Sequence, residues 1–245
     1  MDRTAKNNNC VLSERTQING EDIFEAFLLI IKKGFNMIRI GITGGAGSGK
    51  STVCKLLRSK DLPVIDLDQL ARQVVLPNTP GYTKIVQHFG PQIVLDNKQL
   101  DRSRLRKIIL THASEKQFLE QIIHPEVNRL MQDYFISLEQ NGKPLAFAEV
   151  PLLYEADMPK AFNLCVVVFS TPDIQIQRIR YRDGVNFQEA QKLIQSQMPM
   201  DKKAALADYV ITNNGSYDAL VHEVQKFITF LSLDFKINFL DCVGT

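Results

Sequence analysis

The segment GGAGSGKS at residues 44–51 constrains the fold of this chain more than any other feature. It satisfies the pattern G-x-x-x-x-G-K-[ST], in which the glycines permit a loop whose successive N–H groups converge on phosphate oxygens. An apolar strand pattern precedes the loop at 38–42, and a helical pattern follows it from Lys50 to Lys60. Because the N-terminal end of that helix carries the positive end of the helix dipole, strand, loop and helix together predict a nucleotide-binding α/β domain.

Two side chains of the segment have the chemistry that a bound triphosphate requires. The Lys50 ammonium can reach the β and γ phosphates, and the Ser51 hydroxyl can be a ligand of Mg²⁺. A chance match to the whole pattern is expected about once in a hundred chains of this length, and the flanking strand and helix reduce that further. The sequence therefore predicts that ATP and Mg²⁺ are bound here.

The rest of the chain alternates strands with helices. Strand patterns recur at 63–65, 145–150, 164–169 and 209–212. The apolar run at 164–169 is typical of a strand buried on both faces of a parallel sheet. Helices are expected from Thr171-Pro172, with Thr as N-cap, from Asn186, with Glu189 three residues on, and from about Tyr217 to Leu231. This order favours a three-layer α/β domain over residues 37–231.

The region between the second and third strands is long and mostly helical. It covers about 69–140, and Ser114 with Gln117 predicts a capping box within it. An insertion of this kind suits a substrate-gripping element.

Both ends of the chain extend beyond the expected domain. Residues 1–36 are interpreted as an N-terminal extension that is not part of the fold, with a docked accessory helix as the alternative, and 232–245 as a C-terminal tail. The apolar run Ile23–Ile31 is too short to span a membrane and contains Glu25.

Composition excludes several classes of function. With 44% apolar residues, 23% charged residues and a formal charge of +2, nucleic acid or an anionic membrane is not expected as the main partner. The four cysteines lie far apart without a C-x-x-C pair, which argues against a zinc site and a disulfide framework and fits a reducing cytosol. We expect a cytoplasmic monomer or small homo-oligomer that acts on a small molecule.

Other P-loop classes fit less well. Guanine specificity usually needs N-K-x-D, and the nearest match, at 97–100, has Leu100 in place of the aspartate. Large ATPases usually place an acidic residue at the end of a long apolar strand and add a second domain. Glu149 ends such a strand, but the remaining length offers no room for that domain.

Asp66 and Asp68 are the acidic residues that indicate phosphoryl transfer. The strand that ends there is expected to emerge beside the phosphate-loop strand, at the carboxyl edge of the sheet, with both side chains on one side. One carboxylate can orient an acceptor hydroxyl and take its proton, and a carboxylate there can hold metal-bound water. The alternative is that both residues cap the next helix.

Arg178 and Arg182 are four residues apart and share one helix face. Guanidinium groups bind the equatorial oxygens of a transferring phosphoryl group well, although a solvated basic face is the alternative. Asp183-Gly184 follows as a possible hinge for a lid.

The chain resembles the dephospho-CoA kinase family over about Met37 to Leu231. The residues that carry the resemblance are IGITGGAGSGKST (Ile40 to Thr52), VIDLDQLAR (Val64 to Arg72), IHPEV (Ile123 to Val127), VPLLYE (Val150 to Glu155), RIRYRDG (Arg178 to Gly184) and ADYVITNNG (Ala207 to Gly215). Leu67 departs from the family pattern, which commonly has a small residue between the two acids.

The resemblance implies a P-loop kinase fold with a five-stranded parallel sheet, a helical substrate-binding insertion at about 69–140 and a small lid at about 178–203. It implies transfer of the ATP γ-phosphoryl to the ribose 3′-hydroxyl of dephospho-CoA. Asp68 is the expected base, with Lys50, Arg178 and Arg182 as further catalytic residues and Ser51 with Asp66 at the metal. The expected nucleotide-binding residues are Gly45, Ala46, Gly47, Ser48, Gly49, Lys50, Ser51, Thr52 and, near the adenine, Asn213.

Two other interpretations stay open at this point. One is a different small-molecule kinase, of the nucleoside monophosphate or gluconate type. The other is a P-loop regulatory protein that binds nucleotide without turnover, which the Asp66/Asp68 pair and the arginine helix disfavour.

Overall fold

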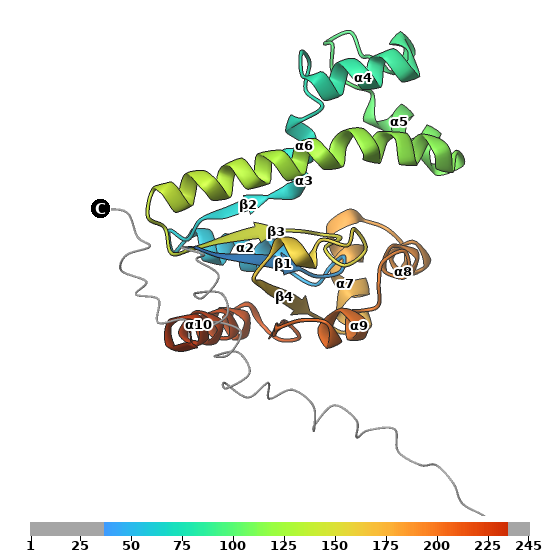
Figure 1. Cartoon of the computed structure of the whole chain (residues 1–245). Coiled ribbons are helices and arrows are strands. Elements are labelled where there is room, and N and C mark those ends of the chain that lie inside the picture. Colours follow the sequence, from blue (N-terminus) through green and yellow to red (C-terminus); the bar gives the residue numbers. More distant parts are fainter. Residues whose placement is uncertain (1–36, 235–245) are drawn as a thin grey trace, which may run out of the picture.

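The structure, a computed structural model, describes residues 37–234 and contains a five-stranded parallel sheet in the order β2-β3-β1-β4-β5 (Figure 1). The strands are β1 (Ile38–Thr43), β2 (Val64–Asp66), β3 (Leu145–Glu149), β4 (Leu164–Phe169) and β5 (Tyr209–Thr212). The predicted α/β class and all five predicted strands are confirmed. The predictions for 1–36, for the end of the C-terminal tail and for the Ile23–Ile31 run lie outside the described residues.

The strand order corrects one prediction. β2 pairs with β3 and not with β1, so the strand that ends at Asp66 does not emerge directly beside the phosphate-loop strand. β3 occupies that place because all five of its residues are buried, whereas the three residues of β2 are only partly buried and suit the edge of the sheet. As a result, Glu149 at the end of β3 is in register with Ile42 of β1.

Helices cover both faces of the sheet (Figure 1). They are α2 (Lys50–Arg58), α3 (Leu67–Gln73), α4 (Pro80–Phe89), α5 (Arg102–Thr111), α6 (Ala113–Gln140), α7 (Pro172–Asp183), α8 (Phe187–Gln195), α9 (Met200–Ala205) and α10 (Tyr217–Asp234), with short 3₁₀ turns η1 (Pro91–Ile93) and η2 (Pro159–Ala161). The closing helix therefore extends three residues beyond its predicted end at Leu231.

The two faces of the sheet form two parts of the core because successive strand residues point to opposite sides. Ile40 and Ile42 pack with α2 and α10 on one face. Ala146 and Ala148 lie on the other face, in a cluster with α3 and the second half of α6. Every one of these four strand side chains is fully buried.

The helical insertion has a small core of its own. Side chains of α4, η1, α5 and the first half of α6 form it, including Ile85, Phe89 and Ile93. The second half of α6 packs on the sheet through Val127, Met131 and Phe135. This one helix therefore joins the insertion to the main core (Figure 1).

Of the two predicted capping boxes, one is confirmed and one is wrong. At the start of α8, the Glu189 N–H donates to Asn186 Oδ1 at 2.9 Å and the Asn186 N–H donates to Glu189 Oε2 at 3.0 Å. α6 begins at Ala113 after His112, without a side-chain cap, so Ser114 is already inside the first turn and cannot act as N-cap.

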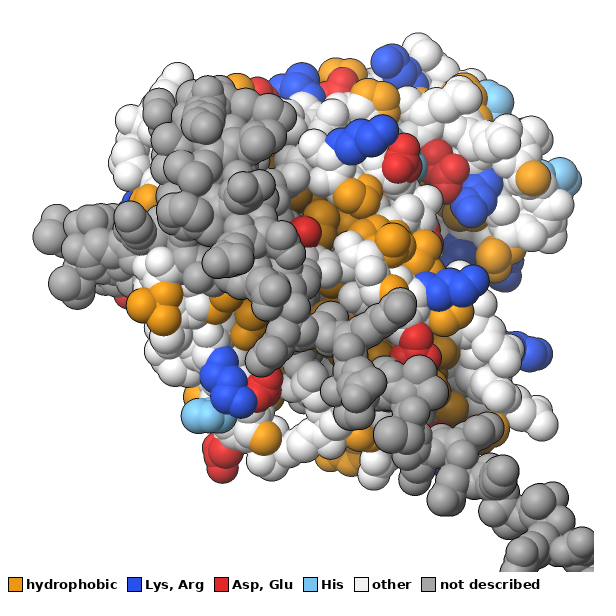
Figure 2. Space-filling model, turned by 60° about the horizontal axis from the view of Figure 1, so that its bottom comes forward, with side chains coloured by type: hydrophobic (Ala, Val, Ile, Leu, Met, Phe, Trp, Pro, Cys, Tyr) orange, Lys and Arg blue, Asp and Glu red, His pale blue; other side chains and the backbone are white. Residues whose placement is uncertain are grey.

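Within residues 37–234, no helix is long and apolar enough to cross a membrane. Figure 2 shows one face of the molecule. Basic and acidic side chains are interspersed over the part of this face where described residues are visible.

Candidate active site

The phosphate loop connects β1 to α2 at the carboxyl ends of the parallel strands, where it borders a cavity of about 840 Å³. Gly47 and Gly49 have φ angles of 74° and 91°, in the left-handed region that residues with a Cβ rarely adopt. A Cβ on Gly49 would also lie 2.1 Å from Nδ2 of Asn213. The loop therefore needs glycine at both positions, and it leaves the first N–H groups of α2 without intrahelical acceptors.

A buried hydrogen-bond network supports the loop from behind. Asn213 Nδ2 donates to the Ser48 carbonyl at 2.8 Å, and the Ser170 hydroxyl donates to the Asn213 carbonyl at 2.6 Å. Asn213 is 5% exposed, so its amide is used within the protein. The cavity wall at this turn is formed by Asn214 and Gly215. Proximity of Asn213 to adenine stays a prediction.

Two N–H groups at the start of the loop already have acceptors. The Gly45 N–H donates to Met200 Sδ at 3.1 Å, and the Ala46 N–H donates to Gln197 Oε1 at 2.8 Å. In contrast, the N–H groups of the two left-handed glycines have no acceptor in the part of the chain that the structure describes. These amides and the start of α2 are the donors that remain for a phosphate.

Glu149 lies at the centre of the site. Its Oε1 accepts hydrogen bonds from Lys50 Nζ at 2.7 Å and from Ser51 Oγ at 2.6 Å, and it is 4% exposed. Burial alone would raise the pKa of this carboxyl, but the hydrogen bonds from Lys50 and Ser51 outweigh burial and hold the pKa below its ordinary value. Glu149 is therefore ionised, and it orients the side chains of Lys50 and Ser51.

The sequence shows Glu149 at the end of an apolar strand, but no role in this site was predicted for it. The signal was its position at the end of a fully apolar strand. That position becomes informative only once β3 is known to neighbour β1, since the ends of adjacent parallel strands meet at one edge of the sheet.

Asp66 and Asp68 do not lie on one side of a strand as predicted. β2 ends at Asp66, and Asp68 is in the first turn of α3. Asp66 is the N-cap of that helix, because its Oδ1 accepts from the N–H groups of Asp68 at 2.9 Å and Gln69 at 3.1 Å. For Asp66, the alternative interpretation as a capping residue describes the geometry.

Asp68 borders two cavities at once. It lines the large cavity of the phosphate loop, and it also lines a second cavity of about 350 Å³ between α3 and the helices α4, α5 and α6. Burial raises the pKa of Asp68 above its ordinary value, with the positive charge of Lys50 as the main opposing influence. A carboxylate in this position can accept a proton from a group that enters from either side.

Arg178 and Arg182 both line the large cavity, but their surroundings differ. Arg178 is held against the loop, since Nη1 donates to Ser170 Oγ at 3.0 Å and Nη2 donates to Asn213 Oδ1 at 3.2 Å. Arg182 is exposed and pairs with both carboxylate oxygens of the adjacent Asp183 at 2.7 Å. Arg178 is therefore fixed in place, whereas Arg182 has a partner that a phosphate can replace.

Residues of α7, of α9 and of the segment between α8 and α9 belong to the site but were not predicted from the sequence. Besides Gln197 and Met200 on the loop, Gln175 Nε2 of α7 donates to the Ala46 carbonyl at 2.7 Å. Lys203 of α9 is fully buried and pairs with Glu155 at 2.9 Å. Glutamine and methionine belong to no phosphate-binding motif, so only the folded structure brings them to the loop.

The residues of the site suit a magnesium ion that is shared with a nucleotide. No group of three or more His, Cys, Asp or Glu side chains that could hold a metal occurs among residues 37–234. Mg²⁺ usually needs only one or two protein oxygens besides phosphates and water. The Ser51 hydroxyl and the Glu149 carboxylate provide such oxygens beside the loop.

Comparison with known proteins identifies the family. A sequence model of the dephospho-CoA kinase family matches residues 38–219. The chain belongs to the dephospho-CoA kinase family. The predicted resemblance is thereby confirmed, and the chain is an ATP-dependent kinase of the transferase class.

Individual relatives within this kinase family cover most of the chain. The dephospho-CoA kinase of Anaeromyxobacter dehalogenans is 38% identical over 78% of this chain and 91% of its own length. The dephospho-CoA kinase of Arabidopsis thaliana is 34% identical over 77% of this chain and 82% of its own length.

Solved structures agree. The dephospho-CoA kinase from Campylobacter jejuni superimposes with a TM-score of 0.62 at 25% identity, covering 79% of this chain and 96% of that one. The protein TT1252 from Thermus thermophilus superimposes with a TM-score of 0.70 at 32% identity, covering 80% and 99%. The kinase family match includes the phosphate loop, Glu149, both cavities and the α7–α9 region.

Proposed function

We propose that this kinase transfers the γ-phosphoryl group of ATP to the ribose 3′-hydroxyl of dephospho-CoA, giving coenzyme A and ADP. One observation carries the proposal beyond family membership. Two cavities of different character meet at a single carboxylate, Asp68. One has the phosphate loop on its wall, and the other is mostly apolar with arginines at its edge.

The donor half holds the ATP phosphates. The open N–H groups of Gly47 and Gly49 and of the start of α2 bind phosphate oxygens, and Lys50 neutralises their charge. Arg178, already fixed beside the loop, adds a cation at the same wall of the cavity. Arg182 releases Asp183 and turns to the phosphates when a nucleotide is bound.

We propose that Mg²⁺ binds together with the nucleotide. It would neutralise part of the negative charge of the phosphates. Ser51 and Glu149 would hold it, directly or through water. Asp66 was predicted as a metal residue. We propose only that it accepts a hydrogen bond from metal-bound water, because its Oδ1 already caps α3.

The acceptor half fits a molecule that carries both a diphosphate and apolar groups. The second cavity is lined by Ala71, Val75, Ile85, Leu100, Leu105, Ile109, Leu119 and Ile123, together with Arg72, Arg102 and Arg106. Guanidinium groups bind a diphosphate through paired hydrogen bonds, and the aliphatic side chains contact adenine or the pantetheine arm.

Asp68 takes the proton of the acceptor hydroxyl as that oxygen attacks the γ phosphorus. The O–H bond breaks, a new O–P bond forms, and the bond from the γ phosphorus to the β–γ bridging oxygen breaks to release ADP. A raised pKa makes the ionised Asp68 carboxylate a stronger base than an ordinary aspartate.

The wider arrangement follows from this assignment. We propose residues 37–231 as the kinase domain, 69–140 as the acceptor-binding insertion and 178–203 as the lid. We also propose that the protein works in the cytoplasm, on small molecules rather than nucleic acid or membrane, as a monomer or small homo-oligomer. The free, buried Cys54 and Cys165 fit a reducing compartment.

A coupled assay of ADP release over a panel of acceptors tests the proposal. We expect turnover with dephospho-CoA and little with adenosine, nucleoside monophosphates, gluconate or shikimate. Nucleotide binding without turnover of any acceptor would favour a regulatory protein, and turnover of a nucleoside monophosphate alone would assign the other kinase type.

A further inference from the structure

The segment between α8 and α9 lies directly on the phosphate loop. Gln197 Oε1 accepts the Ala46 N–H at 2.8 Å, and Met200 Sδ accepts the Gly45 N–H at 3.1 Å. These acceptors are more than 150 residues from their donors in sequence, so the contacts exist only in the folded chain. They close the two loop amides that are farthest from α2.

An ion pair between the buried Lys203 and the partly exposed Glu155 fixes this segment in position. Lys203 Nζ lies 2.9 Å from Glu155 Oε1 and 3.2 Å from Oε2, and Oε1 also accepts the Met198 N–H at 2.9 Å. Burial would raise the pKa of Glu155, but the hydrogen bonds from Lys203 and the Met198 N–H outweigh it and lower the pKa. Because Lys203 has no exposed surface, displacing it would leave an unpaired charge in the interior.

The contact with Ala46 also fixes which way the Gln197 amide points. A backbone N–H can only donate, so the atom that it meets must be the carboxamide oxygen. The NH₂ group of Gln197 is then the other end of the amide, and it has no acceptor among residues 37–234. Gln197 lines the large cavity, so an unused donor is held at a set orientation on the wall of the nucleotide site.

The position of this donor relates it to a third phosphate. The open amides at Gly47, Gly49 and the start of α2 serve the phosphates that ADP and ATP have in common, whereas Lys50 can reach both the β and the γ phosphate. Gln197 lies on the cavity wall at Ala46, the rim near the start of the loop, where the loop amide is no longer available. A γ-phosphoryl group is the additional anionic group that would need a donor at this rim.

We propose that Gln197 donates a hydrogen bond from Nε2 to the γ-phosphoryl group of ATP and so distinguishes ATP from ADP, with Glu155 and Lys203 as positioning residues. The proposal rests on the nucleotide site of the proposed function. It gives the lid segment a role in selecting the donor nucleotide, in addition to covering the cavity.

The test compares ATP and ADP affinities by calorimetry of the full chain with Mg²⁺ and without acceptor. Gln197→Glu keeps an acceptor for Ala46 but removes the donor, and Gln197→Leu removes both without adding charge. Because a hydrogen bond to a charged group is lost, each variant is expected to bind ATP about tenfold more weakly or worse, with the ADP affinity changed much less. The matched control is Gln195→Glu, at the exposed end of α8 and away from both cavities.

The outcomes separate the two proposals. An ATP-selective loss in both Gln197 variants, with an unchanged Gln195→Glu protein, supports the role of Gln197. Equal losses for ATP and ADP, or none, overturn it while the proposed function stands. If the unaltered protein binds neither nucleotide, the proposed function itself fails. Thermal unfolding of each variant checks that an ATP-selective loss does not come from a damaged fold.

The positioning role has its own readout. Lys203→Arg keeps a cation for Glu155 and is expected to preserve the ratio of ATP to ADP affinity. The double variant Glu155→Gln with Lys203→Met keeps an acceptor for the Met198 N–H but removes the ion pair. It is expected to shift the ratio toward ADP, and an unchanged ratio in this folded double variant would limit the pair to a stabilising role.

Discussion

Two carboxylates that are two residues apart differ completely in use. Asp66 caps α3 through backbone hydrogen bonds, whereas Asp68 stands at the junction of two cavities with a raised pKa. Glu149, which is distant in sequence, is the carboxylate that contacts Lys50 and Ser51. The role of each of these carboxylates therefore depends on the position that the fold gives its side chain. Each role can be tested by its own substitution.

Asp68→Asn should lower kcat by roughly 10²-fold or more, because the amide cannot take the acceptor proton. A base acts in its ionised form, so the activity of the unaltered enzyme is expected to fall as pH drops through the Asp68 pKa, which lies above the ordinary aspartate value. Steady-state rates across the acidic range measure both effects. If Asp68→Asn retained near-normal turnover and the same acidic limb, Asp68 would not be the base.

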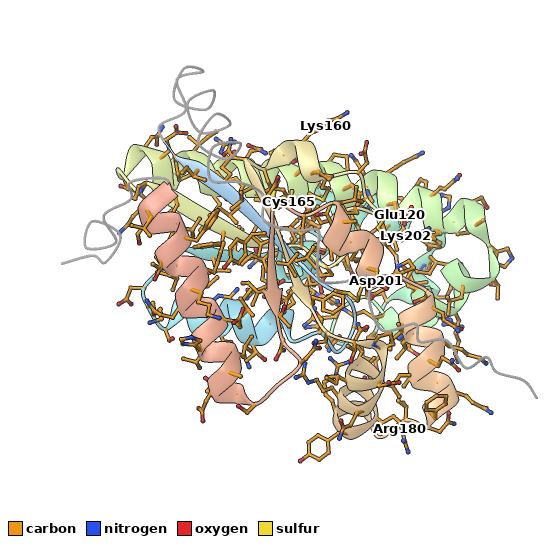
Figure 3. All side chains as sticks on the ribbon, turned by 90° about the horizontal axis from the view of Figure 1, so that it is seen from below. Glu120, Lys160, Cys165, Arg180, Asp201 and Lys202 are labelled. Atoms are coloured by element: carbon orange, nitrogen blue, oxygen red, sulfur yellow. The ribbon has the colours of Figure 1, made fainter. Side chains whose placement is uncertain are left out.

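Arg182→Ala should reduce kcat by at least about tenfold, because a guanidinium on the transferring phosphoryl group is lost. Arg180 provides the matched control: it lies two residues away on α7, is exposed and does not line the cavity (Figure 3). Parallel kinetics on both alanine variants make the comparison. Equal effects would mean that only the general charge of the helix matters.

At the scale of elements, the α7–α9 region is built onto the phosphate loop. α7 supplies Gln175 and Arg178, the α8–α9 connection supplies Gln197, and α9 supplies Met200. The loop is thus held by helices that follow it by more than 120 residues. Glu155, after β3, ties this region to the sheet through Lys203.

Lys203→Met should lower the free energy of unfolding by roughly 1–3 kcal/mol, because a hydrogen bond between charged groups is lost while the partly exposed Glu155 can still be hydrated. Lys202→Met is the control, since Lys202 is the exposed neighbour on α9 (Figure 3). Urea denaturation of both variants gives the two values. A similar small loss in both would show that the buried pair adds little to stability.

At the scale of the whole molecule, the acceptor cavity lies where the insertion meets the main domain. α3 contributes one wall, and α5 and α6 of the insertion contribute the others. Because α6 packs on the sheet with one half and in the insertion core with the other, it sets the distance between the acceptor cavity and the phosphate loop.

Arg106→Ala should raise KM for dephospho-CoA by about tenfold or more while leaving KM for ATP nearly unchanged, since one charged hydrogen bond to the acceptor diphosphate is lost. Arg129 on the exposed face of α6 pairs with Glu126 and Asp133 outside both cavities, so Arg129→Ala is the control. Initial rates at varied acceptor concentration measure the change. Equal rises of both KM values would argue against an acceptor contact.

The phosphate loop, the five strands, the fold class and the family could all be predicted from the order of the amino acids. These are local features: glycine φ angles, strand periodicity and helix caps act within a few residues. Lys50 and Ser51 were identified from the loop motif and Arg178 and Arg182 from helical spacing, whereas Asp68 as the base came from the family resemblance. All five residues line the large cavity.

The distant residues that complete the site can be recognised only in the folded chain. β3 lies between β1 and β2 because it is the more deeply buried strand, and this brings Glu149 to Lys50. Gln197 reaches Ala46 because the ion pair between Glu155 and Lys203 holds its segment there. Strand order and long-range ion pairs depend on the packing of the whole chain, so no local pattern announces them.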